Sequence, residues 1–208
     1  MSDQQLRVCF IGDSFVQGIG DPAYQGWVGR VLAAAGPDVT AFNLGIRRDT
    51  SDDVLARVWT EFSPRSASGS DHRLVVSFGS NDTVLEDGAP RVAPARTLAN
   101  LTALLTEAAE RSIAVLVVGP PPIALYGDEH LGRLLDLADA QAEVCASRGV
   151  PFIPLTAALA TDLAWNAEAL AGDGAHPGTG GYTRAAQVVL DGGFLLWLTT
   201  PQAVSDRQ

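Results

Sequence analysis

The amino-acid sequence predicts an α/β fold, a three-layer α/β/α sandwich around a central, mostly five-stranded parallel sheet. Two observations predict it: short apolar, β-branched runs recur along the 208 residues, and segments with helical spacing of apolar residues separate them. Strands that alternate with helices form right-handed crossovers, which make the strands parallel and place helices on both faces of the sheet. A chain of this length suits one domain, so we expect residues 1–208 to form a single unit.

The elements are expected in a regular order. The predicted strands are residues 7–11, 39–44, 74–78, 113–118 and 150–154. Between them, helical spacing is seen at Trp27, Val31 and Leu32, at Val54 and Val58, at Leu98, Leu101 and Leu105, and at Leu131, Leu134, Leu135 and Leu137. Thr50 and Ser51 are typical of a helix start, and Pro94 fits the first turn of the next helix. A last helix is expected over about residues 179–198.

Composition argues against several classes of partner. The formal net charge is −10 and all 14 basic residues are arginine, so no diffuse basic field is present to attract nucleic acid or an anionic membrane. No apolar run reaches the roughly 18 residues that suggest a membrane span. The first residues lack the basic start and apolar stretch of a signal peptide, and we expect a cytoplasmic protein. Cys9 and Cys145 are expected to be buried, reduced thiols.

The residues that follow the strands are the candidates for chemistry, because ligands bind outside the carboxyl ends of parallel strands. Four such segments stand out. They are Gly12-Asp13-Ser14-Phe15, the run from Asn43 to Thr50, Gly79-Ser80-Asn81-Asp82, and Asp173-Gly174-Ala175-His176-Pro177 ahead of the last helix.

These segments supply the parts of a nucleophilic site. A serine hydroxyl needs an imidazole to take its proton, and the imidazole works best beside a carboxylate that fixes its tautomer. Ser14, His176 and Asp173 fill those roles, and Asn81 offers an amide to a developing oxyanion. Asp13 and Asp82 suggest an oxygen-rich metal site, but bracing the turns through backbone N–H groups is the favoured interpretation. No cofactor or metal is expected.

The sequence resembles the SGNH, or GDSL-type, hydrolases, whose members are esterases, lipases, thioesterases and acetylesterases. Gly12-Asp13-Ser14 resembles the first block of the family, Gly79-Ser80-Asn81-Asp82 the third, and Asp173-Gly174-Ala175-His176-Pro177 the last, in the same order. The resemblance implies a flavodoxin-like sandwich that cleaves carboxylic esters through an acyl-enzyme. It implies a triad of Ser14, Asp173 and His176, with oxyanion donors at the Ser14 backbone and the Asn81 amide.

The sequence departs from the family pattern at two positions. Phe15 stands where the family name has leucine, and Arg48 stands where the second block has an oxyanion-binding glycine. The Arg48 backbone is expected to act as that donor, with Gly45 as the alternative. Arg47 and Trp165 are predicted to contact a small-molecule ester substrate, and the paired guanidinium groups of Arg47 and Arg48 favour an anionic group on it.

Other functions stay open at this point. An acyltransferase or a thioesterase uses the same triad, and a non-catalytic, flavodoxin-like module uses the same strand ends to bind a nucleotide. The sequence lacks the glycine-rich phosphate-binding signatures and the Gly-x-Ser-x-Gly elbow of α/β-hydrolases. His72 and His130 are predicted to be solvated surface residues.

Overall fold

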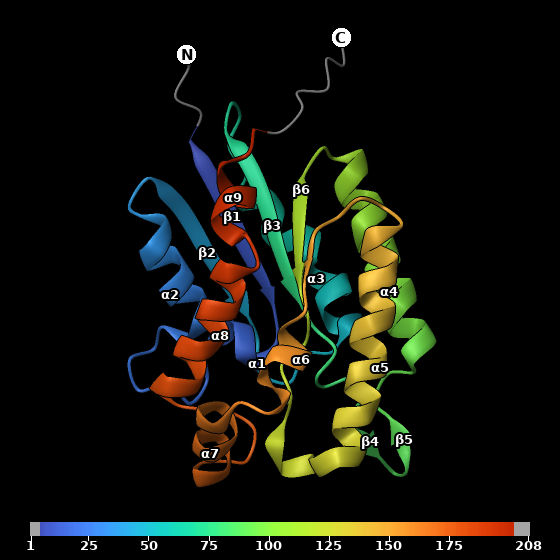
Figure 1. Ribbon diagram of the computed structural model, residues 1–208. Helices are drawn as coiled ribbons and strands as arrows, with labels where there is room; N and C mark the ends of the chain where they lie inside the picture. Colours follow the sequence, from blue (N-terminus) through green and yellow to red (C-terminus); the bar gives the residue numbers. More distant parts are fainter. Residues whose placement is uncertain (1–4, 202–208) are drawn as a thin grey trace.

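A five-stranded parallel sheet forms the centre of the computed structural model, which describes residues 5–201. The strands are β1 (Leu6–Gly12), β2 (Val39–Gly45), β3 (Asp71–Ser77), β6 (Ala114–Val118) and β7 (Phe152–Ile153). They lie in the order β2-β1-β3-β6-β7, and every neighbouring pair is parallel (Figure 1). The predicted three-layer α/β fold is confirmed, and each strand lies within two residues of its predicted bounds at either end, apart from the start of β3, which begins three residues earlier than predicted.

Helices cover both faces of the sheet. They are α1 (Ser14–Gln17), α2 (Gly26–Ala35), α3 (Ser51–Phe62), α4 (Pro94–Glu110), α5 (Gly127–Ala146), α6 (Leu155–Ala160), α7 (Leu163–Ala171), α8 (Thr179–Asp191) and α9 (Phe194–Thr199). Two 3-10 turns, η1 (Ser63–Arg65) and η2 (Ala124–Tyr126), and a short antiparallel hairpin of β4 (Leu85–Glu86) and β5 (Ala89–Pro90) complete the described part of the chain. The sequence did not predict the turns or the hairpin.

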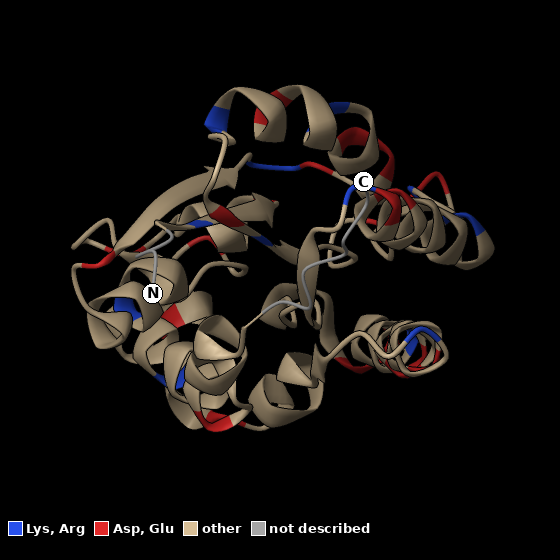
Figure 2. Ribbon diagram, turned by 90° about the horizontal axis from the view of Figure 1, so that it is seen from above, with Lys and Arg blue, Asp and Glu red and all other residues tan. Residues whose placement is uncertain are grey.

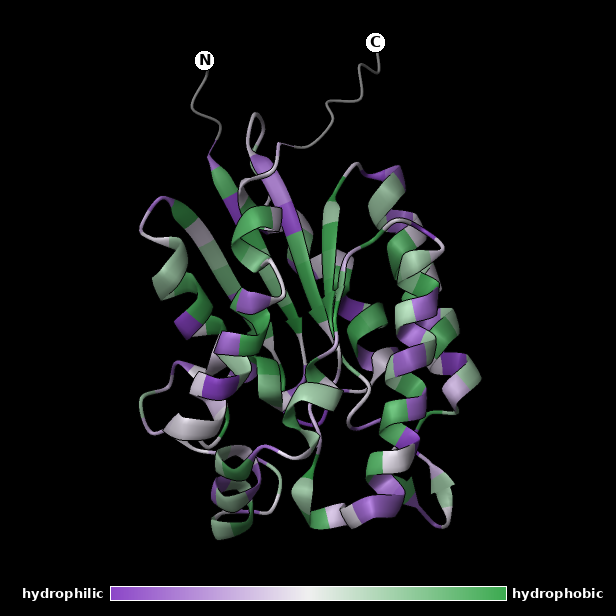
Figure 3. Ribbon diagram, in the orientation of Figure 1, coloured by the Kyte–Doolittle hydropathy of each residue, from purple (hydrophilic) through white to green (hydrophobic). Residues whose placement is uncertain are grey.

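The strands are apolar on both faces because each face packs against helices. Val8 and Phe10 of β1 belong to a core cluster with side chains of α2, α8 and α9, whereas Cys9 and Ile11 belong to a second cluster with side chains of α3 and α4. Successive strand residues point to opposite faces, so two buried faces require a continuous apolar run rather than an alternating one. Figure 3 shows the central strands mostly in the hydrophobic colour.

The expected last helix is in fact two helices. α8 ends at Asp191 and α9 begins at Phe194, because Gly193 adopts a left-handed φ of 93° that interrupts the helical path. Gly192 lies close against Ile153 of β7, where a Cβ would meet three side-chain atoms at 3.0–3.1 Å. The prediction of one continuous helix over residues 179–198 was therefore wrong.

Both cysteines are free and buried, as expected. Burial raises the pKa of the Cys9 thiol and that of the Cys145 thiol to about 11 each. Neither thiol is a ready nucleophile at neutral pH.

Charged residues lie mainly on the surrounding helices and loops, with both signs interspersed (Figure 2). Across residues 5–201, the helices are all too short or too polar to cross a membrane.

Thr50 supplies the cap of α3 that the sequence predicted. Its hydroxyl accepts the Asp53 N–H at 3.5 Å, and the Asp53 carboxylate accepts the Thr50 N–H at 2.8 Å, which makes a reciprocal capping box.

We predict that Thr50→Ala lowers the free energy of unfolding by about 1 kcal/mol, because the first-turn N–H group loses its acceptor. Urea denaturation measures the change. Thr60→Ala on the exposed side of the same helix is the matched control, and we expect it to stay within about 0.5 kcal/mol of wild type. Equal effects of the two substitutions would contradict the capping role.

Candidate active site

The β1–α1 junction places Ser14 at the end of the sheet. α1 begins at Ser14, directly after the strand, and the Asp13 carboxylate caps it by accepting the Phe15 N–H at 2.9 Å. The junction requires glycine at position 12, since a Cβ there would lie 2.0 Å from the Ser77 carbonyl oxygen. Ser14 is consequently held in a fixed place and is only 4% exposed.

His176 and Asp173 reach Ser14 from the turn before α8. His176 Nε2 lies 2.7 Å from Ser14 Oγ, and His176 Nδ1 lies 2.7 Å from Asp173 Oδ2. The other oxygen of Asp173 accepts the backbone N–H groups of His176, at 2.9 Å, and of Ala175, at 3.0 Å. The structure thus joins the three residues in one chain of hydrogen bonds across 162 positions of sequence.

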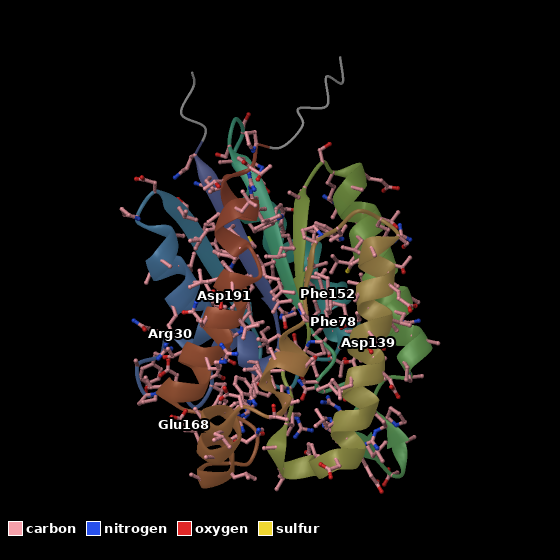
Figure 4. All side chains as sticks on the ribbon, in the orientation of Figure 1. Arg30, Phe78, Asp139, Phe152, Glu168 and Asp191 are labelled. Carbon is pink, nitrogen blue, oxygen red and sulfur yellow. The ribbon has the colours of Figure 1, made fainter. Side chains whose placement is uncertain are left out.

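The turn that carries His176 is anchored between two helices. Glu168 of α7, labelled in Figure 4, accepts the N–H groups of Gly180 at 3.0 Å and Gly181 at 2.8 Å, in the first turn of α8. Gly174 in the turn has a φ of 83°, and its N–H donates to the Ala169 carbonyl oxygen of α7 at 2.8 Å. Both ends of the segment are therefore fixed.

The electrostatics of the chain favour a neutral imidazole beside an ionised carboxylate. Burial raises the pKa of Asp173, but hydrogen bonds from the His176 backbone and ring outweigh it and bring the pKa to about 2. Burial lowers the pKa of His176 below its ordinary value, and the hydrogen bond and charge of Asp173, which raise the pKa, offset this only in part. Because Asp173 accepts from Nδ1, Nε2 is the nitrogen that accepts the Ser14 hydroxyl proton.

Asn81 lies beside the same turn. Its amide donates to the Asp49 carbonyl oxygen at 2.9 Å and to Asp13 Oδ2 at 3.3 Å. Burial raises the pKa of Asp13 to about 7, so this carboxyl group, which also caps α1, titrates near neutral pH. Asp13 therefore connects the turn that carries Ser14 to the amide that the sequence predicted as an oxyanion donor.

Asp82 stabilises the turn after β3 through hydrogen bonds, as the sequence predicted. Its two oxygens accept the Ser51 N–H at 2.8 Å and the Thr97 hydroxyl at 2.7 Å, which ties the loop after β3 to the starts of α3 and α4.

Arg48 adopts the backbone conformation that the glycine of the family would favour. Its φ is 74°, in the left-handed region, which costs a non-glycine residue about 1–2 kcal/mol. Gly45, the alternative donor, is unsuited to the role: its N–H donates to the Asn43 side chain at 3.0 Å. A Cβ at Gly45 would lie 2.1 Å from the Gln17 nitrogen, so this glycine serves the packing of β2 against α1. The expectation for Gly45 was therefore wrong.

A cavity of about 350 Å³ opens beside Ser14 and His176. Residues of η2 and of the β4–β5 hairpin line it, and Figure 1 shows the hairpin beyond the arrowhead end of the sheet. Its wall carries apolar side chains as well as three arginines. The lining residues are Ser14, Phe15, Arg47, Arg48, Asn81, Val84, Leu85, Glu86, Arg91, Ile123, Leu125, Tyr126, Asp173, Ala175 and His176.

Trp165 does not line this cavity, which corrects the prediction that it contacts substrate. Its side chain is fully buried, its indole N–H donates to the Pro122 carbonyl oxygen at 3.0 Å, and its ring packs on Phe15 with centroids 5.7 Å apart. Phe15 in turn contacts the His176 ring at 5.0 Å. Trp165 therefore supports the site from behind.

Arg47 does line the cavity but also pairs with Asp173. Its guanidinium donates to Asp173 Oδ2, the oxygen that accepts from the His176 ring, at 3.2 Å. Both side chains are partly exposed, so this ion pair is open to solvent. Arg47 therefore both lines the cavity and pairs with Asp173, and its contact with a substrate stays a prediction.

The two other histidines lie outside the cavity. His130 is buried within α5, with Nε2 3.1 Å from the Thr83 hydroxyl, so the prediction of a surface position was wrong. His72 is half-buried and accepts the Ala67 N–H at 2.9 Å. Within residues 5–201, no group of three His, Cys, Asp or Glu side chains is placed to hold a metal ion.

Sequence reasoning missed Arg57, which lies beneath the site. From the middle of α3 its guanidinium donates to Asp49 Oδ2 at 2.7 Å, to the Gly12 carbonyl oxygen at 2.9 Å and to Glu61 at 2.7 Å. It therefore links the segments after β1 and β2. No local sequence signal distinguishes it from other helical arginines.

These features define the class of protein: an α/β sandwich with a serine, a histidine and a carboxylate in one hydrogen-bonded chain at the carboxyl end of a parallel sheet. The profile of the GDSL-like lipase/acylhydrolase family matches residues 10–184. The chain belongs to this family and is an ester-hydrolysing enzyme. Among curated proteins, none matches the sequence significantly.

Solved structures resemble this one over most of its length. A lipase/acylhydrolase from Enterococcus faecalis is 28% identical, covers 91% of this chain and 96% of its own, and superposes with a TM-score of 0.69. A catalytic mutant of an acetylxylan esterase from Geobacillus stearothermophilus is 19% identical, with coverages of 97% and 98% and a TM-score of 0.73. An α/β hydrolase from the metagenome of Lake Arreo, Spain, is 20% identical, with coverages of 95% and 98% and a TM-score of 0.74.

We predict that Arg57→Met lowers the free energy of unfolding by about 1.5–3 kcal/mol, because a poorly solvated carboxylate and a carbonyl lose a charged donor. Burial already raises the pKa of Asp49 with Arg57 present. Without Arg57 the ionised Asp49 carboxylate is less stable still in the folded protein, so the loss in free energy of unfolding should be larger at pH 8 than at pH 5. Urea denaturation at both pH values measures it.

The same substitution should lower ester turnover by about tenfold to a hundredfold, because the segments that carry Ser14 and Arg48 lose their common anchor. Arg57→Lys keeps the charge and is expected to recover part of both losses. Wild-type turnover in Arg57→Met would show that the link is not needed for the chemistry.

Proposed function

We propose that this enzyme is a serine esterase that cleaves carboxylic esters through a covalent acyl-enzyme, with Ser14 as nucleophile, His176 as base and Asp173 as the orienting carboxylate. The observation that carries the proposal is the Ser14–His176–Asp173 chain, with both hydrogen bonds at 2.7 Å. Nucleophile and base within this distance, and the base oriented by a third group, are the marks of an activated serine.

The reaction then runs in two halves. Ser14 Oγ attacks the ester carbonyl carbon while His176 Nε2 takes the hydroxyl proton, and His176 returns that proton to the leaving alcohol as the C–O bond breaks. Water next enters, gives a proton to His176 and attacks the acyl-enzyme, and the proton passes back to Ser14 as the carboxylic acid leaves. The low pKa of Asp173 keeps its carboxylate ionised beside the imidazolium that forms in each half. The steps use the chain's own side chains and water.

Three donors are assigned to the oxyanion: the backbone N–H groups of Ser14 and Arg48 and the side-chain amide of Asn81. Among residues 5–201, the two N–H groups make no hydrogen bond with another part of the protein, which leaves them available. The Asn81 amide is held by Asp13 and Asp49, so it donates to the oxyanion by sharing or exchanging one of those contacts. One such donor contributes about 2.7–4 kcal/mol to transition-state stabilisation.

Water is the proposed acceptor, and two related activities use the same residues. An acyltransferase passes the acyl group to an alcohol or amine, and a thioesterase releases a thiol. Product analysis with added acceptors, and thioester substrates tested beside oxygen esters, distinguish these from the esterase. Membership in an enzyme family argues against the non-catalytic binding module. Action in the cytoplasm on a small-molecule ester remains part of this proposal.

We predict that Ser14→Ala and His176→Ala each reduce kcat for p-nitrophenyl acetate by at least about a thousandfold, because triad members act as a unit. Circular dichroism should show an intact fold. Ser147→Ala, at an exposed position directly after the end of α5, is the matched control and should keep wild-type rates. Substantial turnover in either triad variant would overturn the assignment.

We predict that kcat/KM falls as the pH drops, because a protonated His176 is no longer a base. Burial lowers its pKa, so the midpoint of this acid limb should lie below about 6.5. Asp173→Asn should reduce kcat by about a thousandfold or more through the wrong tautomer, and should move the midpoint lower still because the carboxylate no longer favours the imidazolium. A pH–rate profile measures both effects.

Asp139→Asn, an exposed change on α5 (Figure 4), is the control for Asp173→Asn and should leave the profile unchanged. A wild-type rate in Asp173→Asn would show that another carboxylate orients His176.

A further inference from the structure

The cavity beside Ser14 is cationic within an acidic protein. The chain has a net charge of −10, yet Arg47, Arg48 and Arg91 line this cavity against only two lining carboxylates, Glu86 and Asp173. With His176 neutral, three positive charges and two negative ones leave a balance of +1 at the wall. The local charge is therefore opposite in sign to that of the whole chain.

The excess charge belongs to Arg48 and Arg91. Arg47 is paired with Asp173, whereas Arg48 and Arg91 share a single oxygen of Glu86, at 3.6 Å and 3.3 Å. The Arg48 side chain is 73% exposed. Each guanidinium carries five N–H donors in a planar fork, so one carboxylate oxygen leaves donors of both groups unused.

The backbone at Arg48 provides an independent observation. Arg48 has a φ of 74°, where glycine or asparagine is the ordinary residue, and its carbonyl oxygen accepts from Arg91 at 3.1 Å. Strained residues persist where their surroundings fix them, and they cluster at ligand-binding sites. The strained turn lets the consecutive side chains of Arg47 and Arg48 both line one cavity.

We propose that Arg48, with Arg91 beside it, binds an anionic group of the substrate, so that the enzyme prefers esters that carry a carboxylate near the cleaved bond. The guanidinium fork matches a carboxylate with two parallel hydrogen bonds, which a neutral ester does not offer. The apolar part of the wall, which includes Ile123 and Leu125, receives the uncharged part of such a molecule. This inference rests on the proposed esterase function and adds the class of substrate to it.

The test compares anionic and neutral esters of similar size. One pair carries the charge on the acyl side: the mono-p-nitrophenyl ester of glutarate against p-nitrophenyl pentanoate. The other carries it on the alcohol side: 4-acetoxybenzoate against 4-acetoxybenzamide. We expect wild-type kcat/KM to favour the anionic member of at least one pair by about tenfold, and the preference to shrink as salt is raised, because Arg48 is exposed to solvent.

Substitutions at Arg48 assign the preference to its side chain. Arg48→Asn tolerates the left-handed backbone and removes the cation, so the anionic-to-neutral ratio should fall about tenfold. Arg48→Lys keeps the charge without the fork and should lose about threefold. Arg111→Gln removes the same charge just beyond the end of α4, away from the cavity, and should leave the ratio unchanged. Because the anionic-to-neutral ratio is taken within each variant, any effect of the substitution on the catalytic steps common to both esters cancels.

A wild-type ratio near one for both pairs would overturn the inference, as would equal losses on both members of a pair in Arg48→Asn. If Arg48→Asn does not fold, the salt dependence of the wild-type ratio decides, and a ratio independent of salt overturns the inference. The proposed esterase function fails by a different result, turnover of the neutral esters that survives Ser14→Ala.

Discussion

The geometry of the site depends on one close approach, at the end of β1. Gly12 has no side chain because the Ser77 carbonyl oxygen of β3 occupies the space where a Cβ would lie. Its own carbonyl oxygen accepts the Ile46 N–H at 3.0 Å and the Arg57 guanidinium at 2.9 Å. Three neighbouring segments therefore fix the backbone two residues before Ser14, so the position of Ser14 does not depend on a separate loop.

Much of the fold and the site could be predicted because the relevant signals are local. Strands buried on both faces are continuous apolar runs, and the residues after them converge at one edge, so Ser14 and Asn81 could be placed near each other before the structure was known. The Asp173–His176 spacing is also local, since one turn provides both groups. The hairpin of β4 and β5 was missed because two-residue strands show no period.

The remaining errors concern properties that only tertiary structure sets. Trp165 is buried against Phe15 and Tyr182, and His130 is buried with Thr83 and Tyr126 beside its ring; Phe15, Tyr182 and Thr83 are contacts between residues far apart in sequence. The ion pair between Arg47 and Asp173, 126 positions apart, was not predicted, because only the fold brings the two side chains together. Gly45 was considered as a donor because glycine is flexible, whereas the structure uses it for close packing against α1. No local sequence pattern indicates the role of Arg57, because that role depends on the residues that the fold brings next to its guanidinium.

We propose that Ser14 is a nucleophile activated by His176. The most direct measurement is labelling with a fluorophosphonate, followed by intact mass and peptide mapping. We predict one adduct per chain, on Ser14, formed more slowly at low pH as His176 becomes protonated. An adduct on another residue, or no adduct under conditions in which the protein hydrolyses esters, would contradict it.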